Sequence, residues 1–196
     1  MRYLLITLLF LPIQDDVGEG WDLKKDKNGI KIYTQLFPES SFKAFKAITV
    51  MEGIDRDGLM KILMDVDQYD RIFPSLEEAT VIEKEGNYQL QYMQYDAPWP
   101  VSDRDGYYEQ EIKIEGKKKI LYIKCAPGDF PEDPDYIRMV KGHGYWSLED
   151  AGLDRVKIIY EFRPDPAGLI PAWLANSVVV NNPYETLMNL REVIGE

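Results

Sequence analysis

Two stretches decide the fold of this chain: YDAPWPVSDRDGYY, residues 95–108, and DPAGLIPAWLANS, residues 165–177. The first leads into segments with the alternation of strands, and the second opens a segment with the character of a long helix. Their order and context predict a hollow α+β domain that is closed by its C-terminal helix. Such a domain is suited to holding an apolar molecule rather than to cutting or joining one.

The residues before the first stretch predict three strands and a short helical region. Residues 21–26 and 30–37 flank Asn28-Gly29, which is a hairpin signal because both residue types accept positive φ. Residues 42–51 predict a third strand. Residues 55–73 then carry apolar side chains at helical spacing behind Asp55, a favoured N-cap residue type, and predict two short helices.

Beyond residue 80 the apolar and polar residues alternate with a period near two, which is typical of antiparallel strands. The predicted strands are residues 80–84, 88–95, 105–114, 119–125, 136–146 and 155–163. Residues 171–194 predict one long helix, in which Pro183 is expected to cause a bend near residues 179–182. The predicted fold class is therefore α+β, with about nine antiparallel strands, two short helices after the third strand and a long C-terminal helix.

Composition excludes several classes of function. The chain of 196 residues has a formal net charge of −11, which argues against nucleic acid as a partner because that binding depends on Lys and Arg. One cysteine, Cys125, and one histidine, His143, cannot form the clusters that zinc and most redox metals require. We expect no metal and no cofactor, and Cys125 is interpreted as a buried strand residue.

The N-terminus suggests a targeting segment. Arg2 precedes the apolar run YLLITLLFLPI, residues 3–13, which is too short to span a bilayer but fits the h-region of a secretory signal. We predict a signal peptide or leader at residues 1–20 and one ligand-binding domain at residues 21–196. The protein would then be exported, either periplasmic or secreted, if the leader is cleaved, and cytoplasmic otherwise. The alternative is an N-terminal helix or strand that packs on the core.

Four segments resemble the START family of lipid-transfer domains, within the helix-grip (Bet v 1-like) superfamily, in the form of a bacterial-type single-domain member. They are LMDVDQYDRIFPSLEEATVIE, PWPVSDRDGYY, DYIRMVKGHG and DPAGLIPAWLANS, and they lie in the family's order and spacing. The resemblance implies a curved antiparallel sheet that grips the C-terminal helix around a cavity for a sterol, phospholipid, carotenoid or similar ligand. Sterol-binding members often carry an inward arginine on the central strand, where this chain has Gln110.

The leading hypothesis is a non-catalytic carrier or sensor of a hydrophobic small molecule, held in a cavity of roughly 300–1,000 Å³. Gln110 and Arg138 would orient the ligand, while apolar burial would supply most of the affinity. A transient contact with a membrane is also expected. The predicted cavity residues are Tyr92, Tyr108, Gln110, Ile112, Arg138, Tyr160 and Phe162 from the sheet and Trp173, Ser177, Val180 and Tyr184 from the helix.

Two alternatives stay open at the level of function. A polyketide aromatase/cyclase-like enzyme would need cavity-facing proton donors, and His143, Arg138 and the tyrosines are the candidates. An interaction module would instead fill the cavity with its own side chains.

Two charged groups also have alternative roles. Arg138 would pair with an inner carboxylate or contact a ligand headgroup, because a buried arginine needs an acceptor. The Asp103-Arg104-Asp105 run is interpreted as an ion pair that anchors a turn, since neighbouring strand residues point to opposite faces.

Overall fold

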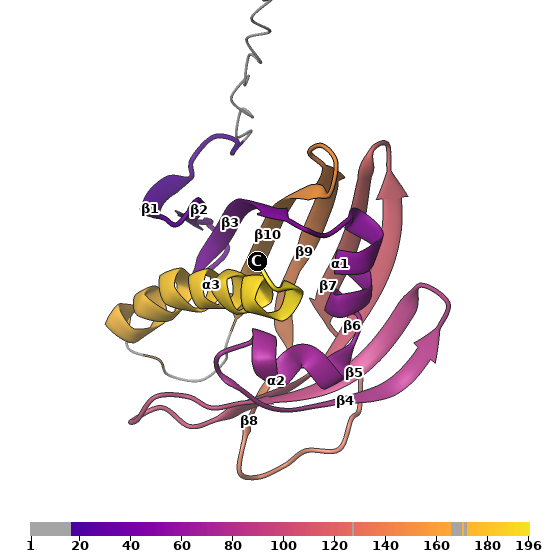
Figure 1. Ribbon diagram of the computed structural model, residues 1–196. Coiled ribbons are helices and arrows are strands. Elements are labelled where there is room, and N and C mark those ends of the chain that lie inside the picture. Colours follow the sequence, from indigo (N-terminus) through magenta and orange to yellow (C-terminus); the bar gives the residue numbers. More distant parts are fainter. Residues whose placement is uncertain (1–16, 127, 166–169, 171) are drawn as a thin grey trace, which may run out of the picture.

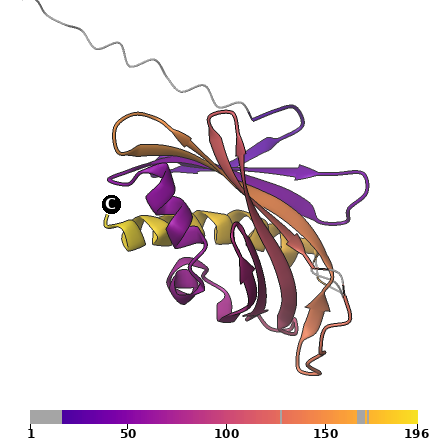
Figure 2. The same cartoon turned by 90° about the vertical axis from the view of Figure 1, so that its right-hand side faces the viewer.

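A single curved sheet with three helices on its concave face makes up the described protein (Figures 1 and 2). The computed structural model describes residues 17–126, 128–165, 170 and 172–196, without the side chains of residues 172, 173 and 175–177. Residues 1–16 of the expected leader lie outside the described residues, so the leader stays a prediction.

Nine strands of the described chain lie side by side in the order β1-β2-β3-β10-β9-β7-β6-β5-β4, and the short β8 pairs parallel to β6. The predicted sheet of about nine strands is therefore confirmed. The strand bounds are β1 (Asp22–Lys27), β2 (Ile30–Leu36), β3 (Lys43–Glu52), β4 (Leu76–Glu85), β5 (Tyr88–Tyr95), β6 (Arg104–Glu115), β7 (Lys118–Cys125), β8 (Ile137–Met139), β9 (Lys141–Asp150) and β10 (Arg155–Asp165).

The prediction of one strand at residues 136–146 was wrong. The segment divides at Val140 into β8 and β9, because its two halves pair with different neighbours. β8 lies parallel to the start of β6, whereas β9 lies antiparallel between β7 and β10. The other strand bounds agree with the predicted alternation to within a few residues, as expected for boundaries read from sequence.

The first hairpin forms as its turn residues predict. Asn28 has φ of 53° and Gly29 has φ of 68°, the left-handed conformation that a tight two-residue turn requires. Lys27 pairs with Ile30 directly across the turn. This local geometry matches the right-handed twist of the two strands.

The helices are α1 (Arg56–Leu63), the 3₁₀ turn η1 (Val66–Gln68), α2 (Tyr69–Ile72) and α3 (Ala172–Ile194). Asp55 caps α1, since its side chain accepts a hydrogen bond from the backbone N–H of Gly58 at 2.6 Å. α3 continues without interruption through Pro183, so the expected bend stays a prediction.

The main hydrophobic core lies between the sheet and the C-terminal half of α3. Trp146, Leu148 and Ile158 project from the sheet toward Leu59 of α1 and Leu187 of α3, and all five are at most 1% exposed. The candidate site is the space beside Val178, Asn182 and Thr186 of the same helix. No helix in the described ranges has both the length and the apolar character that crossing a membrane requires.

Candidate functional site

A cavity of about 240 Å³ lies between α3 and the concave face of the sheet. Strands β3, β5, β6 and β10 form its floor, and the segment after α2 closes one side. Its walls are mostly aromatic or apolar. The principal wall residues are Phe45, Met93, Tyr95, Tyr108, Tyr160 and Phe162. The described residues that line this inner cavity include no charged side chain.

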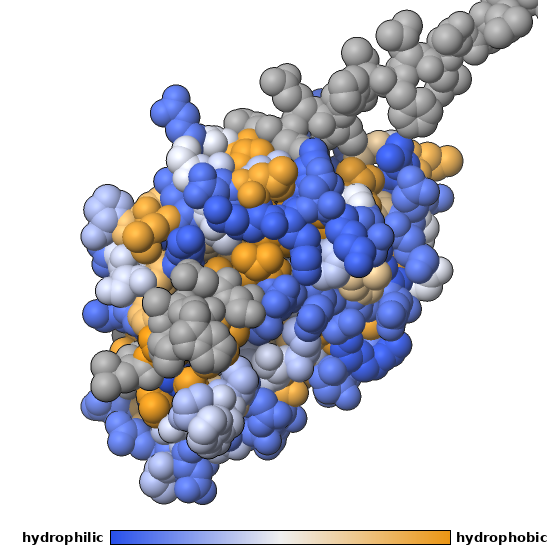
Figure 3. Space-filling view, turned by 90° about the vertical axis from the view of Figure 1, so that its left-hand side faces the viewer, coloured by the Kyte–Doolittle hydropathy of each residue, from blue (hydrophilic) through white to orange (hydrophobic). Residues whose placement is uncertain are grey.

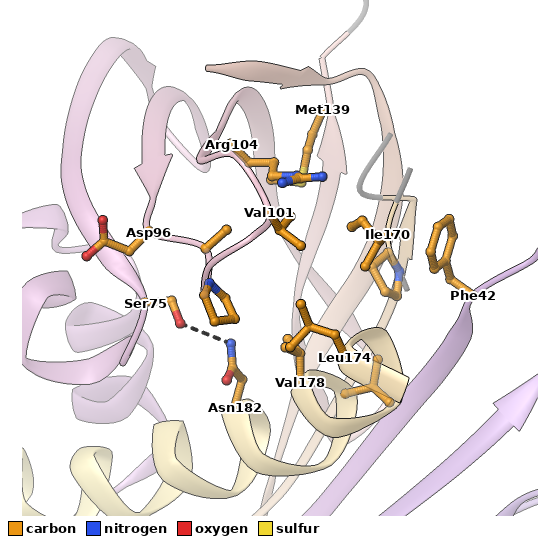
Figure 4. Close-up of a pocket in the computed structure, with 14 residues that line it drawn as sticks. Phe42, Ser75, Asp96, Val101, Arg104, Met139, Ile170, Leu174, Val178 and Asn182 are labelled. Atoms are coloured by element: carbon orange, nitrogen blue, oxygen red, sulfur yellow. Dashed lines mark hydrogen bonds between the residues drawn. The ribbon is translucent and has the colours of Figure 1, made fainter. Parts of the chain in front are cut away.

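A second hollow of about 160 Å³ adjoins the cavity and forms its mouth (Figure 4). The two spaces share wall residues, among them Met139, Val178 and Asn182, so they lie against each other beside α3. Asn182 of α3 donates a hydrogen bond to the Ser75 hydroxyl at 3.3 Å, and both residues line both spaces.

Arg104 is the one cation among the described residues at the mouth, and it is only 5% exposed. Its guanidinium donates to the carbonyl oxygen of Ser102. Burial lowers the pKa of this guanidinium, and the neighbouring carboxylate of Asp103 opposes that effect.

The inner end of the cavity is polar but neutral. Gln91 and Gln110 line it, and both are at most 3% exposed. Gln110 donates through Nε2 to the hydroxyl of Tyr69 at 3.1 Å, and that hydroxyl donates to the carbonyl oxygen of Leu63 at 2.7 Å. Burial raises the pKa of Tyr69 to about 12, so this hydroxyl keeps its proton at neutral pH.

Four of the predicted cavity residues lie on the cavity wall: Tyr108, Gln110, Tyr160 and Phe162. All four were placed by the alternation of β6 and β10, and the structure brings them together under α3. Gly144 lies beside them on β9. An added Cβ there would lie 2.6 Å from the Phe162 ring and 2.1 Å from the backbone oxygen of Glu161.

Tyr92 does not line the cavity, which corrects the sequence prediction. It pairs with Tyr107 across the β5–β6 ladder and therefore shares the outer face of the sheet with it. Its hydroxyl donates to Asp105 Oδ2 at 2.9 Å. Burial, followed by this hydrogen bond, raises the pKa of Tyr92 to about 12.

Arg138 is also absent from the cavity wall, because it pairs with a carboxylate on the outer face. Its Nε and Nη2 atoms donate to the two oxygens of Asp105 at 2.8 and 2.6 Å, and Nη2 also donates to the carbonyl oxygen of Pro131. The guanidinium lies 5.0 Å from the ring centroid of Tyr107. Of the two roles left open, the structure shows the ion pair, although on the outer face rather than the inner one.

Both aspartates of the run Asp103-Arg104-Asp105 have partners outside it. Asp103 accepts from the backbone N–H of Ala97 at 2.8 Å and anchors the β5–β6 loop, while Asp105 binds Arg138. Arg104 points to the mouth. The expected anchoring role holds for Asp103, but its partner is a backbone amide.

Three further predicted residues pack in the main core instead of the cavity: Ile112, Val180 and Tyr184. Tyr184 accepts a hydrogen bond from Asn28 at 2.9 Å, and its ring lies 4.0 Å from the ammonium of Lys25. The helix has two apolar faces, and the prediction chose the face toward β1 and β2. The side chains of Trp173 and Ser177 lie outside the described residues.

Sequence reasoning missed the α3 residues that do face the cavity. Val178, Asn182 and Thr186 recur every four residues and form that face, together with Val179 and Pro183. It also missed Gln91 and Met93. The β5–β6 pairing places Gln91 opposite Tyr108. Because residues that pair across two strands share a face, the predicted inward position of Tyr108 would have identified Gln91 as inward too, had the register been known.

Two further side chains with reactive groups, His143 and Cys125, are not part of the cavity wall. His143 is exposed on the outer face of β9, beside a polar hollow that also contains Tyr145. Cys125 is buried in the strand as predicted, and burial raises the pKa of its thiol to about 12. Within the described ranges no group of His, Cys, Asp and Glu side chains is placed to hold a metal ion.

A curved sheet that grips a long C-terminal helix over an apolar cavity defines the helix-grip class of ligand-binding domains. The START domain profile matches residues 15–193, and the chain belongs to this family.

Individual relatives agree with this assignment. An uncharacterized protein of Pseudomonas aeruginosa is 32% identical over 89% of this chain and 87% of its own length. The mouse phosphatidylcholine transfer protein is 28% identical over 84% of this chain and 78% of its own length. The crystal structure of a STAR-related lipid transfer protein fragment from Xanthomonas axonopodis is 30% identical, with a TM-score of 0.83 over 91% of this chain and 100% of that chain.

Proposed function

We propose that this protein binds and carries a lipid or another hydrophobic small molecule in the cavity beneath α3, without catalysing a reaction on it. The observation that carries the proposal is the uncharged inner cavity, whose walls are largely aromatic and apolar. Apolar burial, at about 25 cal/mol per Å², would supply most of the affinity. The similarity to lipid transfer proteins supports the same class of ligand.

The alternative of a cyclase-like enzyme loses two of its proton donors. His143 and Arg138 lie on the outer face, which leaves Tyr95, Tyr108 and Tyr160 as the titratable groups among the described residues of the cavity wall. Burial raises the pKa of each of these phenols, so none is suited to exchange protons near neutral pH. The alternative of a filled interior is disfavoured by the cavity itself.

The proposal is tested with protein that is purified gently from its own host. Native mass spectrometry is expected to show a bound mass in the range of lipids. Added ligand at 100 times its Kd should stabilise the fold by about 2.7 kcal/mol, which corresponds to a rise in Tm of roughly 5–10 °C. Empty preparations, together with no shift from any member of a lipid panel, would contradict the proposal.

We further propose that ligand exchange takes place while the mouth faces a membrane. Trp99 is 91% exposed at the tip of the β5–β6 loop, and its neighbours Pro98 and Val101 line the mouth. Tryptophan favours the boundary between lipid and water. The face shown in Figure 3 is largely hydrophilic, with separate small apolar patches, which favours contact through a local tip. The net charge of −11 favours membranes without net negative charge.

Replacing Trp99 with serine is expected to slow ligand transfer between zwitterionic vesicles about tenfold, because burial of a large apolar side chain in the interface is lost. Transfer of a fluorescent lipid analogue measures this. Leu153→Ser is the matched control, since Leu153 is also 91% exposed but lies in the β9–β10 turn at the opposite end of the sheet (Figure 1). Equal transfer rates for the two variants would refute the role of Trp99.

A further inference from the structure

The inner end of the cavity carries a specific pattern of hydrogen-bonding groups. Gln91 and Gln110 come from neighbouring strands and lie diagonally across the β5–β6 ladder, on the same face. Gln110 Nε2 donates to the Tyr69 hydroxyl at 3.1 Å, and the diagonal pairing places the Gln91 amide next to that of Gln110 on this face. A buried amide donor or acceptor that lacks a partner costs free energy, so each donor and acceptor of these two amides should have a partner.

Gln110 has an acceptor to spare. A tyrosine hydroxyl has one proton, and the Tyr69 proton is directed to Leu63 O at 2.7 Å, since the alternative acceptor, Gln110 Oε1, lies at 3.4 Å. The Tyr69 oxygen in turn accepts from Gln110 Nε2 at 3.1 Å. The carbonyl oxygen Oε1 of Gln110 is thus left to a ligand.

Gln91 has a donor that is poorly used. Its Oε1 accepts from Gln89 Nε2 at 3.1 Å, which fixes the orientation of the amide. Its Nε2 donates to the sulfur of Met93 at 3.6 Å, and a thioether is a weak acceptor. An oxygen atom from a ligand would be a better partner for this N–H.

One acceptor and one donor, side by side and without charge, are complementary to a hydroxyl group, which donates and accepts at once. A carboxylate cannot donate, and the inner cavity has no cation among its described wall residues to offset its desolvation. An ether or ketone can only accept. A volume of about 240 Å³ is below the usual pocket range and fits one chain or a small ring system.

We infer that the inner cavity takes the neutral hydroxyl end of a single-chain or small-ring amphiphile, held between Gln91 Nε2 and Gln110 Oε1. The inference rests on the proposed function and adds the chemical class of the ligand. The hydrocarbon part of the ligand then lies along the aromatic wall and points to the mouth.

A ligand series with one hydrocarbon chain tests this: decyl alcohol, decyl methyl ether and decanoate, each titrated into the purified protein by calorimetry at pH 7. We expect decyl alcohol to bind about three- to tenfold more tightly than the ether, which is the range for one neutral hydrogen bond. Decanoate should bind still more weakly than the ether. Equal affinity for alcohol and ether, or preference for decanoate, would overturn the inference.

Two variants localise the effect. Gln110→Met and Gln91→Met are each expected to reduce the preference for the alcohol over the ether to within about twofold, because one hydrogen-bonding partner is removed. Gln94→Met is the matched control. Gln94 lies on β5, as Gln91 does, but its amide donates to the Tyr92 hydroxyl on the outer face of the sheet. An unchanged preference for the alcohol in both inner variants contradicts the inference. If neither variant folds, the wild-type series decides alone.

If no member of the series binds and host-purified protein is also empty, the proposed function itself fails. If all three bind equally, only the hydroxyl inference fails.

Discussion

Replacing Arg138 with methionine is expected to lower the free energy of unfolding by about 3–5 kcal/mol, the range for breaking a buried ion pair by removing one partner. Asp105 is 0% exposed, and its buried carboxylate would keep the hydrogen bond from the Tyr92 hydroxyl but lose both hydrogen bonds from Arg138. The stacking of Arg138 over Tyr107 would also be lost. Urea denaturation measures the change.

Two comparisons isolate the cause. The double variant Arg138→Met with Asp105→Asn should recover part of the lost stability, because no buried charge is left. Lys124→Met should change stability little, since its ion pair with Glu109 lies at the surface. Ligand affinity of the folded Arg138 variant should equal that of the wild type, because Arg138 does not line the cavity. A loss of affinity with unchanged stability would restore the headgroup role that the sequence left open.

Most of the fold could be predicted because its signals are local. The alternation of β6 and β10, the Asn28-Gly29 turn and the spacing of apolar residues behind Asp55 each specify one element without reference to distant residues. The division between β8 and β9 could not be predicted in this way. Residues 136–146 carry no turn signal strong enough to end a strand, and their pairing with different strands separates the two halves.

The site was harder to predict than the fold, since it depends on which face of each element is inward. In β5 both faces mix glutamine with apolar residues, and hydropathy alone placed Tyr92 inside where the cavity has Gln91. In α3 both sides are apolar, so periodicity did not distinguish the cavity face at Val178 from the core face at Tyr184. Cross-strand pairing resolves the first ambiguity, and only the packing of the helix on the sheet resolves the second.

Replacing Val178 with tryptophan is expected to weaken binding of an apolar ligand about 100-fold, or roughly 2.7 kcal/mol. Val178 lies on α3 where the mouth meets the inner cavity, and it lines both spaces (Figure 4). An indole ring there would occupy the volume that the ligand needs and obstruct its path. Overpacking should also cost about 1–3 kcal/mol of stability, so affinity must be measured on protein shown to be folded by its denaturation curve. Calorimetric titration with decyl alcohol gives the affinity.

The matched control separates obstruction from general damage to the helix. Val193 lies on the same helix and packs against the main core, away from the cavity wall. Val193→Trp should therefore cost a similar amount of stability while leaving affinity within about threefold of the wild type. Val178→Ala, which widens the junction, should likewise retain binding. If Val178→Trp and Val193→Trp weaken binding equally, the ligand does not enter beneath α3, and the site must be sought elsewhere on the molecule.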